Sequence, residues 1–333
     1  MKINTVIAFM QTFGIILVVI GHSFFNALPN PIATWIYSFH MPLFFFISGF
    51  LFCSSCNKKK KGITDLKLLG RNGILYTKAK RLIIPYVVIS SLVFCPKVIL
   101  SNFAVRPING SYEEYFRMLL YPYENVISFF WFMPTLYLVF VTFILMARFI
   151  KPSAALIVCL FFAHIVISIS HTCILNIDGV IYYLPYFVLG YFMSNNNIIL
   201  VIEKNSKYIA PISLLLSFVF CYGSFLLGFK TANFVCSLNG ILMSYTLGCL
   251  YASGNYRFFN HLFGASFTIY QYSWFAQTLC FQFVYRITGI PFYVAVVLAI
   301  ITGVYFPWFI YRWMKSDGNG KIKQTFRFMC GMK

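Results

Sequence analysis

The chain has 333 residues, of which 60% are hydrophobic and only 10% are charged. Soluble globular domains carry about 25% charged residues, so this composition excludes a soluble domain and indicates a protein with several membrane spans. The net charge of +19 suits a nucleic-acid partner, but the basic residues gather in loops between apolar segments. That distribution is typical of membrane topology and argues against nucleic-acid binding.

Ten apolar segments are long enough to count as spans, because about 20 apolar residues cross a bilayer core of about 30 Å. The sequence therefore predicts an all-α fold, a polytopic bundle of about ten transmembrane helices. Residues 1–313 are expected to form a single integral membrane domain, and residues 314–333 a short basic cytoplasmic tail. The expected spans are residues 3–25, 35–53, 82–104, 127–149, 153–171, 180–194, 208–229, 234–252, 264–285 and 290–313.

The lysines and arginines predict the orientation of these spans. With the N-terminus in the cytoplasm, 21 of the 26 Lys and Arg residues belong to cytoplasmic segments, four belong to outer loops and Lys97 lies within a span. Cytoplasmic loops of membrane proteins carry the excess of positive charge. Both termini are therefore expected in the cytoplasm, which requires an even number of spans.

Two histidines stand in the first two predicted spans, His22 at the end of the first and His40 early in the second. An imidazole within a membrane segment is costly, so it usually faces a protein interior or a wet cavity and carries function. His22 lies 19 residues beyond Ile3, about 28 Å along a helix, and His40 follows Trp35 on a helix that runs back. Both imidazoles are therefore expected at one level near the outer face, where a neutral His can act as a general base. The simpler interpretation is a hydrogen bond to a neighbouring helix.

A weaker pattern continues down the first predicted helix. Gln11, Ile15, Val18 and His22 share one stripe at helical spacing. Gln11 is polar within an apolar helix, so it is expected to face the same interior as His22. A path from the cytoplasmic half of the helix to His22 is consistent with this stripe.

The other polar residues of the predicted spans and outer loops are few. His164, in the fifth predicted span, is expected to bond a neighbouring helix. Lys97 either extends its ammonium outward or offers a cation to a substrate. The chain has only seven acidic residues, and nothing in the sequence selects one as the partner of His22. The acidic candidates in outer loops are Glu113, Glu114, Glu124 and Asp178.

The first cytoplasmic loop carries two basic runs, Lys58–Lys61 and Lys78–Arg81. Either run can be attracted to anionic lipid headgroups or can dock a phosphate-bearing cytosolic ligand. Lipid attraction is the better interpretation of Lys58–Lys61. For Lys78–Arg81, which adjoins the predicted span starting at Leu82, both interpretations stay open.

No metal site is predicted. His22 and His40 have no Asp, Glu or Cys near them in sequence, and neither HxxxH nor HExxH occurs. Cys53–Cys56 is the only CxxC pair in the sequence, and it lacks the second pair that a zinc site needs. A serine nucleophile is equally unsupported, because the sequence has no G-x-S-x-G motif.

Six sequence blocks, taken in order, resemble the acyltransferase-3 family of membrane-bound O-acyltransferases. Within that family they look most like the fucose O-acetylase-like branch of bacterial polysaccharide acetyltransferases. The resemblance covers nearly the whole chain, and the block around His40 with an upstream Gly-His pair is the most specific part. The blocks are GIILVVIGH (14–22), YSFHMPLFFFISGFL (37–51), KRLIIPY (80–86), FWFMPTL (130–136), YLPYFVLGY (183–191) and GASFTIYQYSW (264–274).

The resemblance implies a ten-helix enzyme of the bacterial cytoplasmic (inner) membrane. Such an enzyme moves an acetyl group from acetyl-CoA to a sugar hydroxyl of a cell-envelope or exported polysaccharide, or of its lipid-linked precursor. Acetyl-CoA is then a co-substrate and no cofactor is bound. The implied partners are acetyl-CoA, a glycan acceptor and membrane lipids, and the oligomeric state is not indicated.

The resemblance also implies roles for individual residues. His22 matches the catalytic histidine of the first helix. In the mechanism that this match and the positions of the two histidines suggest, His40 positions the acceptor or stabilises the developing oxyanion. Lys78 and Arg81 match the basic start of the third helix, which implies a contact with CoA phosphates. Trp131 matches an aromatic position of the family pattern and is grouped with the donor site.

The first helix departs from the family pattern at two positions. Members usually carry a Lys or Arg linked to donor use eleven residues before the histidine, where this chain has Gln11. They carry an Asp three residues earlier, where this chain has Ala8. Both halves of a charge pair are thus absent together, so no buried charge is left unpaired.

Two other functions remain open from the sequence. A transporter or flippase of envelope glycan also places polar residues within its spans, although the chain shows no internal repeat. A catalytically degenerate member of the family is the third interpretation, and the departures at Ala8 and Gln11 suit it.

Overall fold

All regular structure in the described part of the chain is helical. Within that part, seven helices are long and apolar enough to cross a membrane. The predicted class, an all-α polytopic membrane protein, is therefore confirmed, with seven candidate spans where the sequence predicts about ten. The structure, a computed structural model, describes residues 3–24, 30–101, 107–167, 169–170, 172–227, 230–317 and 320–332.

Three predicted spans differ from these seven helices. The fifth corresponds to α7 (Ala154–Val166), which has only 13 residues. The sixth corresponds to α8 (Ile177–Ser194), in which Asp178 and four tyrosines lower the mean hydropathy. The ninth corresponds to α12 (Ser266–Leu279), whose 14 residues continue directly into the π-helix η6 (Cys280–Tyr285).

The chain divides into two compact units, each built from two parts of the sequence. The first unit comprises Met1–Phe52 and Leu189–Ser316, and the second comprises Cys53–Val188 and Asp317–Lys333. The two candidate catalytic histidines therefore belong to the first unit. The basic run Lys78–Arg81 belongs to the second.

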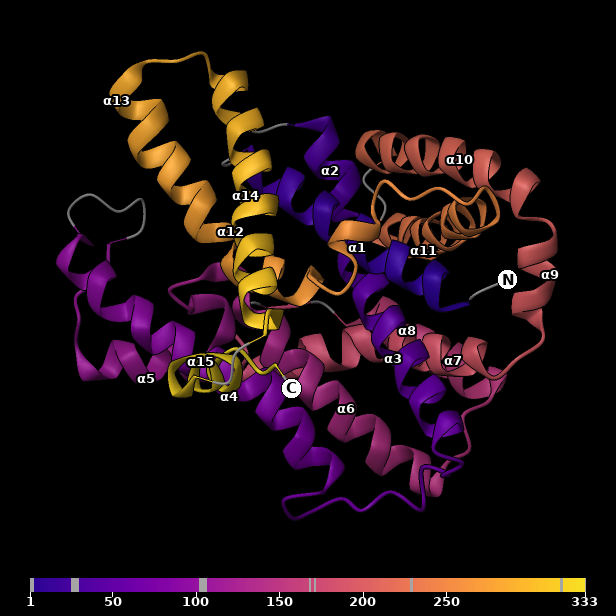
Figure 1. Cartoon of the computed structure of the whole chain (residues 1–333). Coiled ribbons are helices and arrows are strands. Elements are labelled where there is room, and N and C mark those ends of the chain that lie inside the picture. The colour runs from indigo at the N-terminus through magenta and orange to yellow at the C-terminus, as the bar shows by residue number, and fades with distance from the viewer. Residues whose placement is uncertain are drawn as a thin grey trace. The chain divides into compact units, whose positions relative to one another are not determined.

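The first unit is arranged around its N-terminal helix. Besides α12, η6, the first part of α3 and the end of α8, its helices are α1 (Ile3–Ser23), α2 (Pro31–Tyr37), α3 (His40–Lys58), α9 (Ile198–Lys204), α10 (Ser206–Leu227), α11 (Lys230–Ser253), η5 (Asn260–Leu262), α13 (Arg286–Thr288) and α14 (Phe292–Lys315). The helix α1 contacts α2, α11, α12 and α14. Figure 1 shows α12 beside α14, and α10 beside α11. Polar side chains on α1 therefore have protein neighbours on several sides.

The short helix α2 is fixed at both ends. Asn30 caps its start, because its Oδ1 accepts from the N–H groups of Ile32 at 2.9 Å and Ala33 at 3.2 Å. Trp35 Nε1 donates to Ser217 Oγ of α10 at 3.0 Å. A buried apolar cluster joins α2 to α1 and α11, and it is formed by Leu17, Ile36, Phe39 and Met243.

The second unit is arranged around α4 (Ile74–Ile99), which contacts α5, α6 and α15. Besides α7, the end of α3 and most of α8, its other helices are α5 (Tyr112–Leu120), η2 (Pro122–Glu124), η3 (Ser128–Trp131), α6 (Phe132–Phe149), η4 (Ile174–Asn176) and α15 (Lys321–Met329). Arg148, in the last turn of α6, donates to the carbonyl of Leu66 at 3.0 Å. The end of α6 therefore lies beside the loop that leads into α4.

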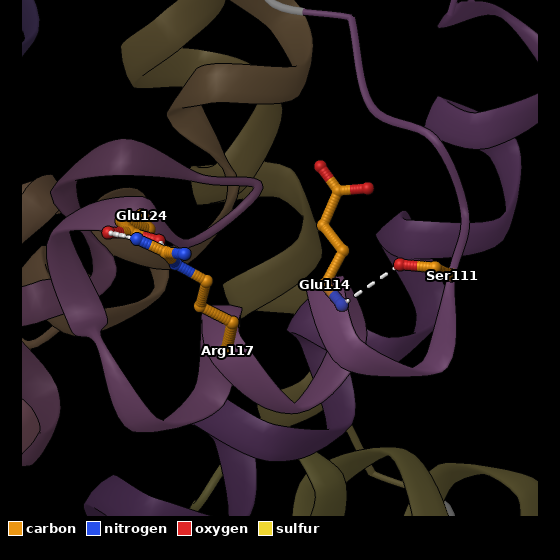
Figure 2. Close-up of polar contacts among 4 residues, drawn as sticks. All are labelled: Ser111, Glu114, Arg117 and Glu124. Carbon is orange, nitrogen blue, oxygen red and sulfur yellow. Dashed lines mark hydrogen bonds and ion pairs between the residues drawn. The ribbon is translucent and has the colours of Figure 1, made fainter.

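The segment between α4 and α6 is folded back along α4, where the sequence predicts an outer loop with solvated carboxylates. Tyr86 Oη of α4 donates to the carbonyl of Met118 in α5 at 2.9 Å, and Met118 is buried. Ser111 caps α5 by accepting from the N–H of Glu114 at 3.2 Å, as Figure 2 shows. One face of α5 is therefore attached to α4, and the opposite face is exposed.

The basic tail contains α15, which packs against α4. Cys330, just beyond α15, is buried, and a side chain at Gly331 would meet the carbonyl oxygen of Arg81 at 2.6 Å. Lys80 Nζ lies 4.8 Å from the centroid of the Phe328 ring, a cation–π contact. The tail is therefore attached to the helix that carries the predicted donor-binding residues.

Candidate functional site

Tyr37 stands between the two candidate catalytic histidines. The ring centroids of His22 and Tyr37 are 5.7 Å apart, and those of Tyr37 and His40 are 5.4 Å apart. His22 is half-buried near the end of α1, and His40 is buried at the start of α3. The structure therefore brings the two imidazoles into one site.

A glycine admits the tyrosine ring to this site. A Cβ atom at Gly21 would lie 2.9 Å from Cε1 and 3.4 Å from Cζ of Tyr37. Real Cβ atoms almost never approach another atom so closely, so any larger residue at this position displaces the ring. Gly21 therefore allows Tyr37 to pack beside His22, the next residue of α1.

A hydrogen bond shows which ring nitrogen of His40 is available for chemistry. Nδ1 of His40 lies 3.0 Å from the carbonyl oxygen of Ile36. A carbonyl oxygen only accepts, so Nδ1 carries the proton. In the neutral ring Nε2 is then unprotonated and accepts a hydrogen bond. His40 is therefore suited to hold a hydroxyl group, and less suited to donate to an oxyanion.

The end of α1 is held by a buried glutamine of α12. Gln277 Nε2 donates to the carbonyl oxygen of Val19 and to Ser23 Oγ, both at 2.8 Å. Ser23 Oγ itself donates to the Val19 carbonyl at 2.8 Å. These bonds satisfy groups in the last turn of α1, and so they orient the turn that carries His22.

We expect Gln277→Leu to destabilise the protein, because it keeps the approximate size of the side chain but removes both donated hydrogen bonds. Loss of a partner in a buried polar network costs about 1–3 kcal/mol. The measurement is the thermal unfolding midpoint in detergent. The control is Thr325→Val at an exposed position of α15, which should leave the midpoint unchanged. Equal midpoints for Gln277→Leu and wild type would contradict this role.

Lys78 and Arg81, the predicted contacts for the donor, lie three residues apart on α4 and share a face of the helix. Lys78 Nζ lies 3.6 Å from the centroid of the Phe140 ring on α6. Arg81 is exposed. Lys78 therefore lies at the contact between α4 and α6, whereas Arg81 lies at the surface, where a phosphate group can reach it.

Trp131, which the resemblance groups with the donor site, belongs to an aromatic stack. Its ring is stacked with Tyr123 at 5.1 Å and with Tyr183 at 5.5 Å between centroids. Burial raises the pKa of Tyr123, and the charge of Asp178 adds to the effect. Trp131 is the last residue of η3, and Phe140 follows nine residues later on α6. About 13 Å of helix therefore separates Trp131 from the ring that Lys78 contacts.

Gln11 lies in the first unit, unlike Lys78, Arg81 and Trp131. It is half-buried on α1. Eleven residues separate it from His22, about 16 Å along the helix axis. Gln11 and His22 therefore lie on the same helix, at the separation along that helix that the sequence predicts.

Two further polar residues have structural partners. His164 Nδ1 lies 2.8 Å from the carbonyl oxygen of Tyr182, and its Nε2 lies 3.2 Å from Tyr186 Oη. Both partners are on α8, which confirms the predicted bond to a neighbouring helix. Lys97 Nζ donates to the carbonyl of Val126 at 3.0 Å, so its ammonium supports the chain between η2 and η3.

Sequence reasoning missed Tyr37 and Gln277. Tyr37 precedes His40 by three residues, a spacing that can place two side chains on one face, and this was the available clue. Gln277 is polar within an apolar segment, but no spacing rule relates it to a residue 254 positions earlier. Among the described residues, no three His, Cys, Asp or Glu side chains gather as a metal site requires.

Comparison with known proteins shows which family the chain belongs to. A family model described as an acyltransferase domain, that of the acyltransferase-3 family, matches residues 5–312. No curated protein and no solved structure matches the chain. The matched range contains both histidines and the basic run on α4. It also contains the seven candidate spans, apart from the first residue of α1's span and the last three residues of α14. The chain therefore belongs to the acyltransferase-3 family and is an integral membrane acyltransferase.

Proposed function

We propose that this chain transfers an acetyl group from cytoplasmic acetyl-CoA to a sugar hydroxyl on the other side of the bacterial inner membrane. The acceptor is a cell-envelope or exported polysaccharide, or its lipid-linked precursor. The observation that carries the proposal is the contact of His22 and His40 with Tyr37, in a chain that belongs to an acyltransferase family. A neutral imidazole beside a bound hydroxyl is the usual general base for acyl transfer near pH 7.

In the proposed reaction the acceptor hydroxyl oxygen attacks the thioester carbonyl carbon of acetyl-CoA, while His22 removes the hydroxyl proton. The carbon–sulfur bond then breaks, and the departing CoA thiolate takes the proton from His22. The products are an acetyl ester on the sugar and CoA with a free thiol. His22 is the proposed base because it is half-buried, whereas His40 is enclosed.

His40 is the proposed positioning group for the acceptor. Its Nδ1 is engaged with the carbonyl of Ile36, so its Nε2 can accept a hydrogen bond from a sugar hydroxyl. Tyr37 packs against both imidazoles and limits their movement. This division of roles supports acceptor positioning over oxyanion stabilisation as the function of His40.

Lys78 and Arg81 are the proposed contacts for the phosphates of acetyl-CoA, and Gln11 and Trp131 the proposed further donor-binding residues. A guanidinium forms two parallel hydrogen bonds to a phosphate, and Arg81 is exposed. We expect Arg81→Gln to raise the KM for acetyl-CoA about 10- to 100-fold, with little change in the KM for the glycan. Arg71→Gln, at an exposed position of the preceding loop, is the control. An unchanged KM for acetyl-CoA in Arg81→Gln would remove Arg81 from the donor site.

The function itself is tested with the purified chain, acetyl-CoA labelled in the acetyl group and a crude envelope glycan. We expect label to enter the glycan as an ester that mild base releases. Omission of acetyl-CoA or of the glycan should abolish the labelled product. Movement of glycan across a membrane without any donor would instead indicate a transporter or flippase.

A further inference from the structure

An open cavity of about 520 Å³ lies on the exposed face of α5. The residues that line it are Glu113, Phe116, Arg117 and Leu120 of α5, together with Tyr121, Glu124 and Thr172. Ligand-binding clefts usually have about 300–1,000 Å³, so this cavity is large enough for a small ligand. It contains none of the residues assigned to catalysis or donor binding above, and it is therefore a separate candidate site.

The cavity is built on an anchored support. Tyr86 of α4 and Asn125 both donate to the carbonyl oxygen of Met118, at 2.9 and 3.3 Å. The hydroxyl oxygens of Ser91 on α4 and Tyr115 on α5 lie 2.8 Å apart. These contacts hold the buried face of α5, so the opposite face, which lines the cavity, is positioned before a ligand arrives.

The N-terminus of α5 is supported separately. Glu114 Oε2 accepts from the N–H groups of Asn109 at 2.7 Å and Gly110 at 3.2 Å. In Figure 2, Glu114 lies beside Ser111 and apart from the pair formed by Arg117 and Glu124. Glu114 therefore stabilises the start of the helix and does not line the cavity.

An ion pair forms one wall of the cavity. Arg117 Nε lies 2.5 Å from Glu124 Oε2, and its Nη2 lies 3.1 Å from Oε1 (Figure 2). The hydrogen bond to Glu124 raises the pKa of Arg117, because it favours the charged form. The guanidinium also lies 5.6 Å from the centroid of the Tyr121 ring. The pair thus presents hydrogen-bond donors and acceptors in a fixed arrangement.

The charge of the cavity indicates what kind of ligand it accepts. Glu113, Glu124 and Arg117 are its charged side chains, and together they have a net charge of −1 in a chain of net charge +19. A negative site repels the phosphates of acetyl-CoA, whereas an uncharged ligand pays no such electrostatic cost. The cavity is therefore unsuited to the donor headgroup and suited to a neutral, polar molecule.

The remaining groups of the cavity fit a sugar. Carboxylates accept hydrogen bonds from sugar hydroxyls, and a guanidinium donates to sugar oxygens. The ring of Phe116 is 59% exposed and offers an apolar face to the C–H face of a pyranose ring. We propose that this cavity binds neutral sugar residues of the acceptor glycan, an assignment that rests on the proposed function.

The test uses the purified full chain in lipid nanodiscs, as wild type, Phe116→Ala and Glu113→Gln. Tyr112→Ala is the matched control, because Tyr112 is an exposed aromatic residue one turn earlier on α5 and does not line the cavity. One measurement is the binding of fluorescently labelled crude envelope glycan without any donor. The other is the KM for this glycan and for acetyl-CoA in the transfer reaction.

We expect Phe116→Ala and Glu113→Gln each to raise the Kd and the KM for the glycan about tenfold. The KM for acetyl-CoA should stay the same, and Tyr112→Ala should behave as wild type. Wild-type glycan binding in both variants, or no glycan binding by wild type, would overturn the proposal. A rise confined to the KM for acetyl-CoA would also overturn it, by assigning the cavity to the donor. Binding that depends on Phe116 and Glu113 without any acetyl transfer would refute the proposed function and support the glycan site.

Discussion

His22→Ala is expected to reduce the rate of acetyl transfer by about 100- to 10,000-fold, the usual contribution of general acid–base catalysis. The reason is that the acceptor hydroxyl loses the group that removes its proton. Binding of acetyl-CoA should be unaffected, because the proposed phosphate contacts Lys78 and Arg81 are intact. The measurement is the initial rate at saturating acetyl-CoA, together with the Kd for CoA.

Two further histidine variants test whether the loss of activity in His22→Ala comes from the loss of a base at His22. His22→Gln keeps a hydrogen-bonding side chain but cannot take a proton at neutral pH, so it should lose about as much activity as His22→Ala. His261→Ala is the control, since His261 is exposed in η5, where its ring is stacked with Tyr305 at 6.1 Å. It should retain the wild-type rate. Near-wild-type transfer by His22→Gln would show that His22 is not the base.

Gly190→Ala is expected to cause a large loss of stability in the first unit. Gly190 is buried on α8, and an added Cβ would collide with the carbonyl oxygen of Phe46 on α3 and lie 2.8 Å from its carbonyl carbon. Small residues allow helix backbones to approach closely in membrane proteins. The obstacle is backbone, so relief requires the helices to separate. We expect unfolding free energy to fall by about 1–3 kcal/mol or more.

A second glycine provides the matched control for this substitution. Gly223 lies within α10, and an added Cβ would meet no atom within 4 Å. Gly223→Ala should therefore stabilise the helix by about 0.5–1 kcal/mol, through reduced conformational freedom of the unfolded chain. Thermal unfolding in detergent measures both variants. If Gly190→Ala unfolds at or above the wild-type midpoint, the close contact between α3 and α8 is wrong.

The helical class and the histidine pair could be predicted from the sequence, because each depends on the local cost of polarity in an apolar segment. A long apolar run must satisfy its own backbone hydrogen bonds, so it forms a helix. His22 and His40 stand out because few polar residues interrupt these runs. His40 follows His22 by only 18 residues, so the sequence already indicates that the two histidines lie near each other, whereas the contact of both with Tyr37 depends on where the helices end.

The features of the fold that could not be predicted from the sequence depend on contacts between residues far apart in the chain. Fewer spans are found than predicted in part because α7 has only 13 residues and ends at Val166. The return of α5 along α4 depends on the bond from Tyr86 to Met118, 32 residues apart. The position of α15 depends on the close approach of Gly331 to Arg81. Hydropathy and local spacing contain no information on such pairs, so the exposed cavity of α5 could not be predicted either.

Sealed proteoliposomes test most directly whether this chain moves acetyl groups from CoA to a glycan across the membrane. The purified chain is reconstituted with envelope glycan enclosed, and acetyl-CoA labelled in its acetyl group is supplied outside. We predict base-labile label on the enclosed glycan with wild type and none with His22→Ala, while acetyl-CoA itself stays outside. Enclosed glycan that stays unlabelled with wild type, or that leaves the vesicles without any donor, would contradict the proposed transfer.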